Sequence, residues 1–444
     1  MTDRVVSTAT PIPSIDALVG RFVGGCKCPE AWRIGVEHEK IGVRVDTGEP
    51  VRYADIVQLF GALADHEGWD RVLEDDRLIA LARPPERITL EPGGQLELSG
   101  EPVFTLTEVD RELRNHLAEI RRRSAPLDLR WLGVGFRPFG GIDAVPWVPK
   151  GRYDVMRVVL GRTGTRGHDM MKRTATVQAN LDYSTEADAA EKLSAAMGVT
   201  SIVTALFASS PLAGDADTGH QSYRAAAWLD TDPARCGLLP FAFGKRDGLF
   251  RAYTEWALDV PLLFLYRAGC YFEAPGFTFR RFLREGYQGE AATIEDWDTH
   301  LTTLFPEVRL KHYLEVRGAD AGSVPMMLAL PALYKGILYD AEARRATVAL
   351  TDGWSYAERL AVRDAVPRAG LRVPLPPSAR GTMADLAREL VAIARAGLGR
   401  LAPNEVGYLA PVEEVAATER TQADRIRELW RGDRQELIAA LAIS

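Results

Sequence analysis

Apolar and polar residues alternate along the stretch 88–100, and the alternation is interrupted by a Pro-Gly-Gly turn at 92–94. Successive side chains of a β-strand point to opposite faces of a sheet, so Gln95 and Glu97 share one face and two leucines share the other. The leucine face is typical of a strand packed on a core. The opposite face, together with Glu91 at the edge of the turn, indicates a polar site.

Three further stretches carry the same pattern of two polar residues at i and i+2 between apolar neighbours. The pairs are Glu37 and Glu39, Gln178 and Asn180, and Glu315 and Arg317. A strand with one solvated face also alternates, so a single pair indicates little. Four such segments, rich in Glu and amides, predict a sheet with one face forming a polar site. His38, between two glutamates, is expected to face the core on the other side.

The remaining pattern predicts a mixture of helices and strands. Strands are predicted at 34–45, 78–81, 88–98, 130–136, 172–182 and 310–317, and the longer helices at 53–67, 105–123, 185–209, 326–340 and 382–396. The four polar strands span most of the first 340 residues, so one domain, 1–340, is expected to contain the site. Residues 341–444 are predicted to be a helical part packed on that domain, either separate or continuous with it. The fold class is therefore α+β.

Composition excludes several classes of protein. The chain has 444 residues, 46% of them hydrophobic, and a net charge of −7 without a basic block, which argues against nucleic-acid binding. The longest apolar run, 197–208, is too short to cross a bilayer. Residues 1–14 lack a signal-peptide pattern, so a soluble cytoplasmic protein is expected. Four cysteines, at 26, 28, 236 and 270, form no disulfide framework, and reduced thiols are expected.

The clustered glutamates indicate a metal. Two carboxylates about 4 Å apart repel by about 4 kcal/mol at an effective dielectric constant near 20, so such a cluster needs cations or raised pKa values. Oxygen ligands without cysteine suit Mg²⁺, or alternatively Mn²⁺, and carboxylate-bound Mg²⁺ commonly also binds phosphate. This combination predicts ATP chemistry. The chain contains no P-loop, dinucleotide fingerprint, zinc-protease motif or nucleophile elbow.

Several longer motifs resemble those of glutamate–cysteine ligases of the plant and proteobacterial type. They are 35–40 (GVEHEK), 88–100, 149–153 (PKGRY), 167–171 (GHDMM), 174–182 and 305–320 (FPEVRLKHYLEVRGAD). The resemblance extends from about residue 30 to about residue 340. It implies the glutamine-synthetase-like carboxylate–amine ligase fold, a curved antiparallel sheet with helices on its convex side. The concave face would then bind Mg²⁺, ATP and an amino acid.

The resemblance also implies a reaction, the first step of glutathione biosynthesis. L-Glutamate, L-cysteine and ATP would give γ-glutamylcysteine, ADP and phosphate through a γ-glutamyl phosphate intermediate. Expected partners are these small molecules only, with no nucleic acid and no membrane, and the protein is expected to be a monomer or a homodimer.

The motifs assign roles to particular residues as far as the resemblance holds. The metal ligands would be Glu37, Glu39, Glu91, Glu97, Gln178 and Glu315. Arg317 would stabilise the transferring phosphoryl group, although a simple ion pair with a nearby Glu is the alternative. Arg152 and Arg224 would hold the glutamate α-carboxylate, with a solvated surface role as the alternative. Arg157 and Asn180 are weaker candidates for substrate binding, and Met171 would line the pocket or simply pack in the core.

Three segments depart from the family pattern. In the family, the motif RGAD, here at 317–320, is usually followed by GGPWR. In this chain it is followed by AGSVPMM at 321–327. The GFxPKW loop is GFRPFG at 135–140, and three alanines occupy 225–227. These changes leave the metal and glutamate motifs intact. They motivate one alternative, a γ-glutamyl ligase of secondary metabolism with another amine acceptor. A further alternative is a non-catalytic binding or regulatory paralogue, and the intact carboxylates argue against it.

Overall fold

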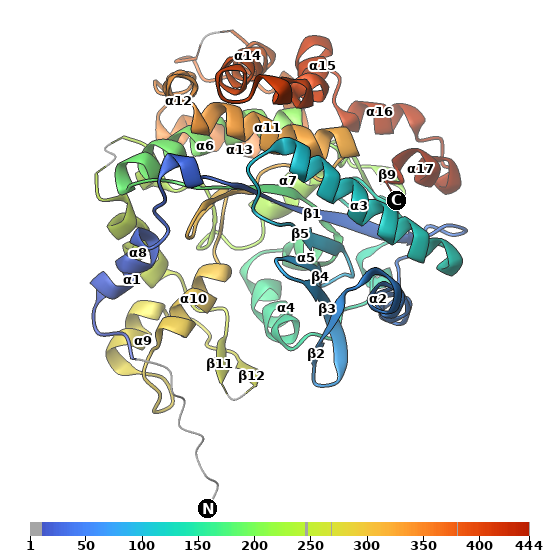
Figure 1. Cartoon of the computed structure of the whole chain (residues 1–444), viewed down its shortest axis with the longest axis horizontal. Helices are drawn as coiled ribbons and strands as arrows, with labels where there is room; N and C mark the ends of the chain where they lie inside the picture. The colour runs from blue at the N-terminus through green and yellow to red at the C-terminus, as the bar shows by residue number, and fades with distance from the viewer. Residues whose placement is uncertain (1–10, 245–246, 268, 380, 444) are drawn as a thin grey trace, which may run out of the picture.

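The computed structural model describes residues 11–244, 247–267, 269–379 and 381–443. In this part of the chain a nine-stranded antiparallel sheet forms the centre of the molecule (Figure 1). Its strands are β1 (Ile34–Arg44), β2 (Asp70–Glu74), β3 (Arg77–Arg83), β4 (Glu86–Leu90), β5 (Leu96–Ser99), β6 (Leu129–Leu132), β7 (Val177–Leu181), β14 (Val308–Leu310) and β15 (Leu314–Val316). The order is β14-β15-β7-β1-β5-β4-β3-β2, and β6 pairs with the second half of β1. The predicted α+β class is confirmed.

Helices make up most of the remaining structure. They are α1 (Ile15–Val23), α2 (Tyr53–Glu67), α3 (Leu106–Ser124), α4 (Gly151–Thr163), α5 (Gly167–Arg173), α6 (Glu186–Leu206), α7 (Tyr223–Leu229), α8 (Leu249–Asp259), α9 (Phe279–Glu285), α10 (Ile294–Thr302), α11 (Val324–Tyr339), α12 (Ala341–Ala349), α13 (Tyr356–Ala369), α14 (Met383–Leu401), α15 (Ala410–Thr418), α16 (Gln422–Leu429) and α17 (Arg434–Leu441). Short two-stranded pairs join β8 (Leu212–Ala213) to β9 (Ala216–Asp217), β10 (Cys236–Gly237) to β13 (Phe305–Pro306), and β11 (Leu265–Arg267) to β12 (Cys270–Phe272). No helix in the described ranges is long and apolar enough to cross a membrane.

Strand β1 is central because it pairs with three other strands. Its register places Glu37 opposite Gln178 of β7 and Glu39 opposite Glu97 of β5. Asn180 lies in turn opposite Glu315 of β15. Directly opposed residues present their side chains on the same face of a sheet, so the alternating polar pairs of four distant segments converge.

The other face of the sheet is covered by α3, α6 and α11, which lie above it in Figure 1. His38 points to this side, as predicted, and its ring lies 5.5 Å from that of His116 on α3. His38 Nδ1 is buried and has no hydrogen-bond partner among the described residues. Burial, followed by the nearby Lys40 charge, holds the pKa of His38 well below its ordinary value.

The C-terminal helices pack directly on this layer. Leu333 of α11 and Leu390 of α14 belong to the same apolar core as the strands. Lys335 Nζ lies 2.6 Å from Glu405 Oε2, and Glu405 Oε1 accepts a 3.0 Å hydrogen bond from the backbone N–H of Leu106. Glu405 thus joins the helical cover to α11 by a buried ion pair and to α3 by a hydrogen bond. The division at residue 340 remains a prediction.

Four predicted strands differ in the structure. Residues 88–98 belong to two antiparallel strands, β4 and β5, and the strand predicted at 130–136 ends at Leu132. Residues 172–182 were expected to form one strand, but Lys172 and Arg173 complete α5 and only Val177–Leu181 joins the sheet. Residues 310–317 were also expected to form one strand, whereas β14 and β15 form a hairpin between 308 and 316. Alternation of side chains does not distinguish a continuous strand from two strands that meet at a tight turn.

Candidate active site

A cavity of about 260 Å³ lies on the uncovered face of the sheet. Strands β1, β4, β5 and β7 supply its polar floor, and α4, α5 and α7 supply its walls. Nine of the residues singled out in the sequence line it: Glu37, Glu39, Glu91, Glu97, Gln178, Arg152, Arg224, Arg317 and Met171. Residues separated by up to 280 positions therefore meet in one cavity because of the sheet register.

The turn that carries Glu91 is fixed by a buried amide. Gln95 Oε1 accepts a 2.9 Å hydrogen bond from Gly93 N, and Gln95 Nε2 donates to the carbonyl oxygens of Met171 and Thr174. A Cβ atom at Gly93 would lie 2.1 Å from the Lys172 carbonyl oxygen, so only glycine allows this close approach. The β4–β5 turn is thereby attached to the end of α5.

Four carboxylates in the cavity have no cationic partner within 4 Å in the described part of the chain: Glu37, Glu39, Glu91 and Glu97. Burial, then the charges of Glu315 and Glu97, raises the pKa of Glu37 to about 7. Burial and neighbouring glutamates also raise the pKa of Glu39 well above its ordinary value, and that of Glu97 to a smaller extent. The site therefore contains negative charge that a bound cation would relieve.

Neutral donors hold three of these carboxylates in place. Thr89 Oγ1 donates to Glu97 Oε2 at 2.6 Å, the backbone N–H of Thr176 donates to Glu39 Oε2 at 3.0 Å, and Asn180 Nδ2 donates to Glu37 Oε1 at 2.8 Å. Each carboxylate keeps its other oxygen available. The glutamates are positioned without being neutralised.

Glu315 has different surroundings from the other predicted metal ligands. It is fully buried, and its oxygens pair with Arg309 Nη2 at 2.6 Å, with Lys311 Nζ at 2.7 Å and with Arg317. Burial alone would raise the pKa of Glu315, but these three cations outweigh it and hold the pKa well below the usual range. A metal ion bound to Glu315 would have to displace at least one of them.

Two arginines connect the strand hairpin to α7. Arg317 Nη1 donates to Gln178 Oε1 at 2.7 Å, and Arg224 Nη2 donates to the Arg317 carbonyl oxygen at 2.9 Å. Both guanidinium groups line the cavity, and Arg152 lines it from α4. Arg224 is only 4% exposed, so the alternative of a solvated surface role is wrong for this residue.

Three predicted site residues lie apart from the cavity lining. Arg157 is exposed, with its guanidinium carbon 5.4 Å from the centre of the Trp147 ring. Asn180 contacts the lining residue Glu37, and Glu315 contacts the lining residues Arg309 and Arg317. The lining residues that sequence reasoning missed include Thr89, Lys150, Trp228 and Arg309. Thr89 alternates with Glu91 in the strand pattern and Lys150 lies in the PKGRY motif, so both carried a detectable signal.

The potential metal ligands in the cavity are carboxylate and amide oxygens, which are the ligands that Mg²⁺ prefers. No three His, Cys, Asp or Glu side chains of the described residues form a ready-made metal group. Mg²⁺ usually takes one or two carboxylates together with water and substrate phosphates, so a complete protein cage is not required.

Comparison with known proteins identifies the family. The family model described as Glutamate-cysteine ligase family 2 (GCS2) matches residues 33–440. The chain belongs to glutamate–cysteine ligase family 2. Among curated members, the chloroplastic glutamate–cysteine ligase of Brassica juncea is 42% identical over 435 residues, covering 97% of this chain and 84% of the relative. The chloroplastic enzyme of Arabidopsis thaliana is 41% identical over 435 residues, covering 97% of this chain and 82% of the relative.

A solved structure has the same fold. The glutamate–cysteine ligase of Francisella tularensis, determined in complex with AMP, superposes with a TM-score of 0.60 at 14% identity, covering 93% of this chain and 87% of that chain. The sheet of this family member is thus of the glutamine-synthetase-like type, as expected. The expected cytoplasmic location is contradicted, because the curated relatives are named as chloroplastic enzymes.

Proposed function

We propose that this member of glutamate–cysteine ligase family 2 joins the γ-carboxylate of L-glutamate to the amino group of L-cysteine at the expense of ATP. The observation that carries the proposal is the single cavity in which unneutralised glutamates face Arg317 and Arg224. An amine acceptor other than cysteine is not favoured, since relatives that match 97% of the chain are named for cysteine.

Arg317 stabilises the phosphoryl group during its transfer to the γ-carboxylate. Its guanidinium is held on one side by Gln178 and Glu315, so it is oriented before the substrate arrives. A preorganised cation at the position where charge develops lowers the barrier more than a mobile one. Arg224 and Arg152 are proposed to bind the α-carboxylate of glutamate from the two walls of the same cavity.

The carboxylates Glu39, Glu91 and Glu97, with Glu37, Gln178 and Glu315 beside them, are proposed to hold Mg²⁺, with Mn²⁺ as a substitute. Bound Mg²⁺ would neutralise phosphate oxygens of ATP and so assist phosphoryl transfer. The residues of the chain supply oxygen ligands that Thr89, Thr176 and Asn180 fix in orientation.

The reaction balances in two steps. In the first, a γ-carboxylate oxygen of glutamate attacks the γ-phosphorus of ATP and ADP leaves. In the second, the acceptor nitrogen forms the C–N bond as the C–O bond to phosphate breaks. The ammonium form of the acceptor loses two protons in total, of which the departing phosphate takes one and water the other. No oxidant or reductant is needed.

The test is ADP release by the purified protein with Mg-ATP and L-glutamate, across a panel of amino acids, with product masses. Cysteine is expected to be the best acceptor and γ-glutamylcysteine the product. Glu97→Gln is expected to abolish turnover, with Glu112→Gln as a matched control. Burial also raises the pKa of Glu112 to about 7, but Glu112 lies on α3 outside the cavity. Full activity in Glu97→Gln would contradict the site. The predicted monomer or homodimer is checked by light scattering.

A further inference from the structure

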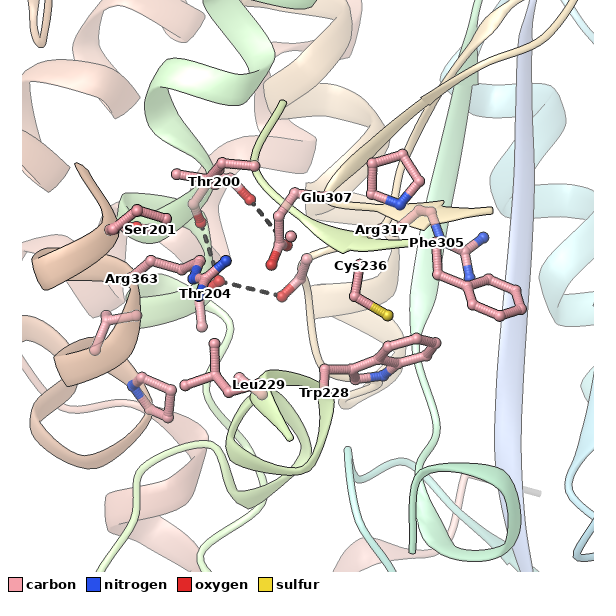
Figure 2. A pocket seen from close by; sticks show the side chains of 18 of the residues that line it. Thr200, Ser201, Thr204, Trp228, Leu229, Cys236, Phe305, Glu307, Arg317 and Arg363 are labelled. Carbon is pink, nitrogen blue, oxygen red and sulfur yellow. Dashed lines mark hydrogen bonds between the residues drawn. The ribbon is translucent and has the colours of Figure 1, made fainter. Parts of the chain in front are cut away.

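A second cavity, of about 270 Å³, lies next to the first. Four side chains line both cavities and form the wall between them: Arg224, Trp228, Phe305 and Arg317. The remaining lining comes mainly from α6, α7, α13, the segment 232–238 that contains β10, and the segment before β14 (Figure 2). A molecule bound here would contact the same two arginines that are proposed to handle glutamate and its phosphoryl group.

The second cavity carries one carboxylate and one guanidinium that are suited to a ligand. Glu307 is half-buried and has no cationic partner within 4 Å among the described residues, and its contact is a 3.3 Å hydrogen bond from Thr200 Oγ1. Arg363 of α13 pairs only with its neighbour Asp364, at 2.7 Å, within the described part of the chain. Figure 2 shows both side chains among those that line the cavity.

The backbone next to Arg363 is shaped to admit its guanidinium. Gly237 has a φ of +93°, and a Cβ atom there would lie 2.4 Å from Arg363 Nη1. Glycine is therefore favoured by conformation, and its missing side chain leaves room for the guanidinium. The lining also includes Asp232, which is paired with Arg235, and a small or apolar part that contains Ala225, Leu229 and Val366. Such a lining accommodates a short side chain.

We propose that this second cavity binds the acceptor amino acid, with Glu307 receiving its ammonium group and Arg363 its carboxylate. The inference rests on the proposed function and assigns the acceptor to a position that the sequence pattern did not indicate. A zwitterion matches one carboxylate and one guanidinium in a small polar cavity. Pockets for drug-sized ligands begin at roughly 300 Å³, so this volume suits an amino acid.

A nucleotide is a poor match for the same cavity. Its phosphates would meet the Glu307 carboxylate, which has no cationic partner within 4 Å among the described residues. The assignment also gives α13, which belongs to the C-terminal helices, a part in substrate recognition. The C-terminal helices would then contribute to substrate binding as well as covering the sheet.

The first test fills the cavity from α7. Ala225 lines it, whereas the adjacent Ala226, equally half-buried, does not, so Ala225→Leu and Ala226→Leu form a matched pair. Ala225→Leu is expected to raise KM for cysteine by about tenfold or more, and KM for glutamate is expected to stay unchanged. Ala226→Leu is expected to change neither. An equal rise in both variants, or a rise in KM for glutamate alone, would overturn the assignment.

Hydroxylamine separates failure of this assignment from failure of the proposed function. It traps γ-glutamyl phosphate as a hydroxamate and has neither a carboxylate nor a side chain to be recognised. Wild type and Ala225→Leu are both expected to form γ-glutamyl hydroxamate at similar rates with glutamate and Mg-ATP. If wild type forms none, the proposed function fails. If Ala225→Leu loses the hydroxamate but keeps its melting temperature, the second cavity serves glutamate instead of the acceptor.

The second test addresses Arg363 directly. Arg363→Gln is expected to raise KM for cysteine about 10–100-fold, because one charged hydrogen bond is lost. Turnover with cysteamine is expected to stay unchanged, because cysteamine has no carboxylate. Arg395→Gln is the control, an ion-paired arginine of α14 remote from both cavities. Equal losses with cysteine and cysteamine would show that Arg363 is structural and would overturn its role.

Discussion

Arg224 Nη2 donates a 2.9 Å hydrogen bond to the backbone carbonyl oxygen of Arg317, although 93 residues separate the two in sequence. Asp320 reinforces this contact: its carboxylate accepts hydrogen bonds from the hydroxyls of Ser210 and Ser222, and Arg224 Nη1 lies 3.9 Å from it. The N-terminal end of α7 is thereby attached to the strand end that carries Arg317. The two arginines form one unit at the wall between the cavities.

Replacing Arg317 by lysine is expected to lower kcat by about 10²-fold or more while the fold survives. A lysine retains the charge but cannot contact Gln178 and Glu315 with a planar fork. Arg309 and Lys311 remain to neutralise Glu315. Steady-state kinetics and thermal melting check this outcome, and wild-type kcat in the variant would show that Arg317 is only an ion-pair partner.

The stability of the metal-free protein is expected to depend on pH through the crowded glutamates. The pKa of Glu37 rises from 4.5 to about 7 on folding, so the folded state holds this proton more tightly than the unfolded chain. Ionisation of this carboxyl therefore lowers the free energy of unfolding progressively as pH rises from about 4.5 to about 7, and the loss is complete above about pH 7. Glu39 and Glu97 shift in the same direction.

Melting temperatures measured in EDTA are accordingly expected to rise as pH falls from 8 to 6. At lower pH, protonation of other carboxylates limits this rise in melting temperature. Glu37→Gln is expected to reduce this slope and to stabilise the metal-free protein at pH 8 by ~1–3 kcal/mol, since one pKa unit is about 1.4 kcal/mol. Added Mg²⁺ is expected to stabilise wild type more than the variant. A flat profile between pH 6 and 8 in EDTA would contradict the charge crowding.

Replacing Gly93 by alanine is expected to lower the free energy of unfolding by ~1–3 kcal/mol, because the new Cβ would lie against the Lys172 carbonyl oxygen. The displacement moves the turn that carries Glu91, so activity is expected to fall as well. Gly61→Ala is a suitable control, because a Cβ at this position of α2 meets nothing within 4 Å. Urea denaturation of both variants decides the outcome, and equal stability would show that the turn adapts freely.

Removing the Glu405 carboxylate is expected to destabilise the protein by ~3–5 kcal/mol, since Lys335 would remain buried without a counter-charge. The double variant Lys335→Met with Glu405→Leu is expected to recover much of this loss, because no charge is left uncompensated. Denaturation curves of wild type, single and double variants measure the coupling. Additive losses would show that the ion pair does not join α11 to the C-terminal helices.

The alternating pattern of the chain was sufficient to predict the chemistry of the first cavity. Glu37, Glu39 and Glu97 could be assigned to one face because side chains of a strand alternate strictly, and their crowding followed from charge alone. The longer motifs then identified the family. The same alternation could not show that 308–316 forms a hairpin, because side chains alternate along both strands of a hairpin as they do along one continuous strand.

The tertiary structure decided which polar residues share a cavity. Glu307, Arg363 and Trp228 belong to three segments with no common periodicity, and only the packing of α7 and α13 beside β14 brings them together. It also decided that Glu315 is neutralised by Arg309, Lys311 and Arg317 while Glu97 is left without a cation. A sequence specifies which faces its residues occupy through local periodicity, whereas the distance between charges on different elements depends on how those elements pack.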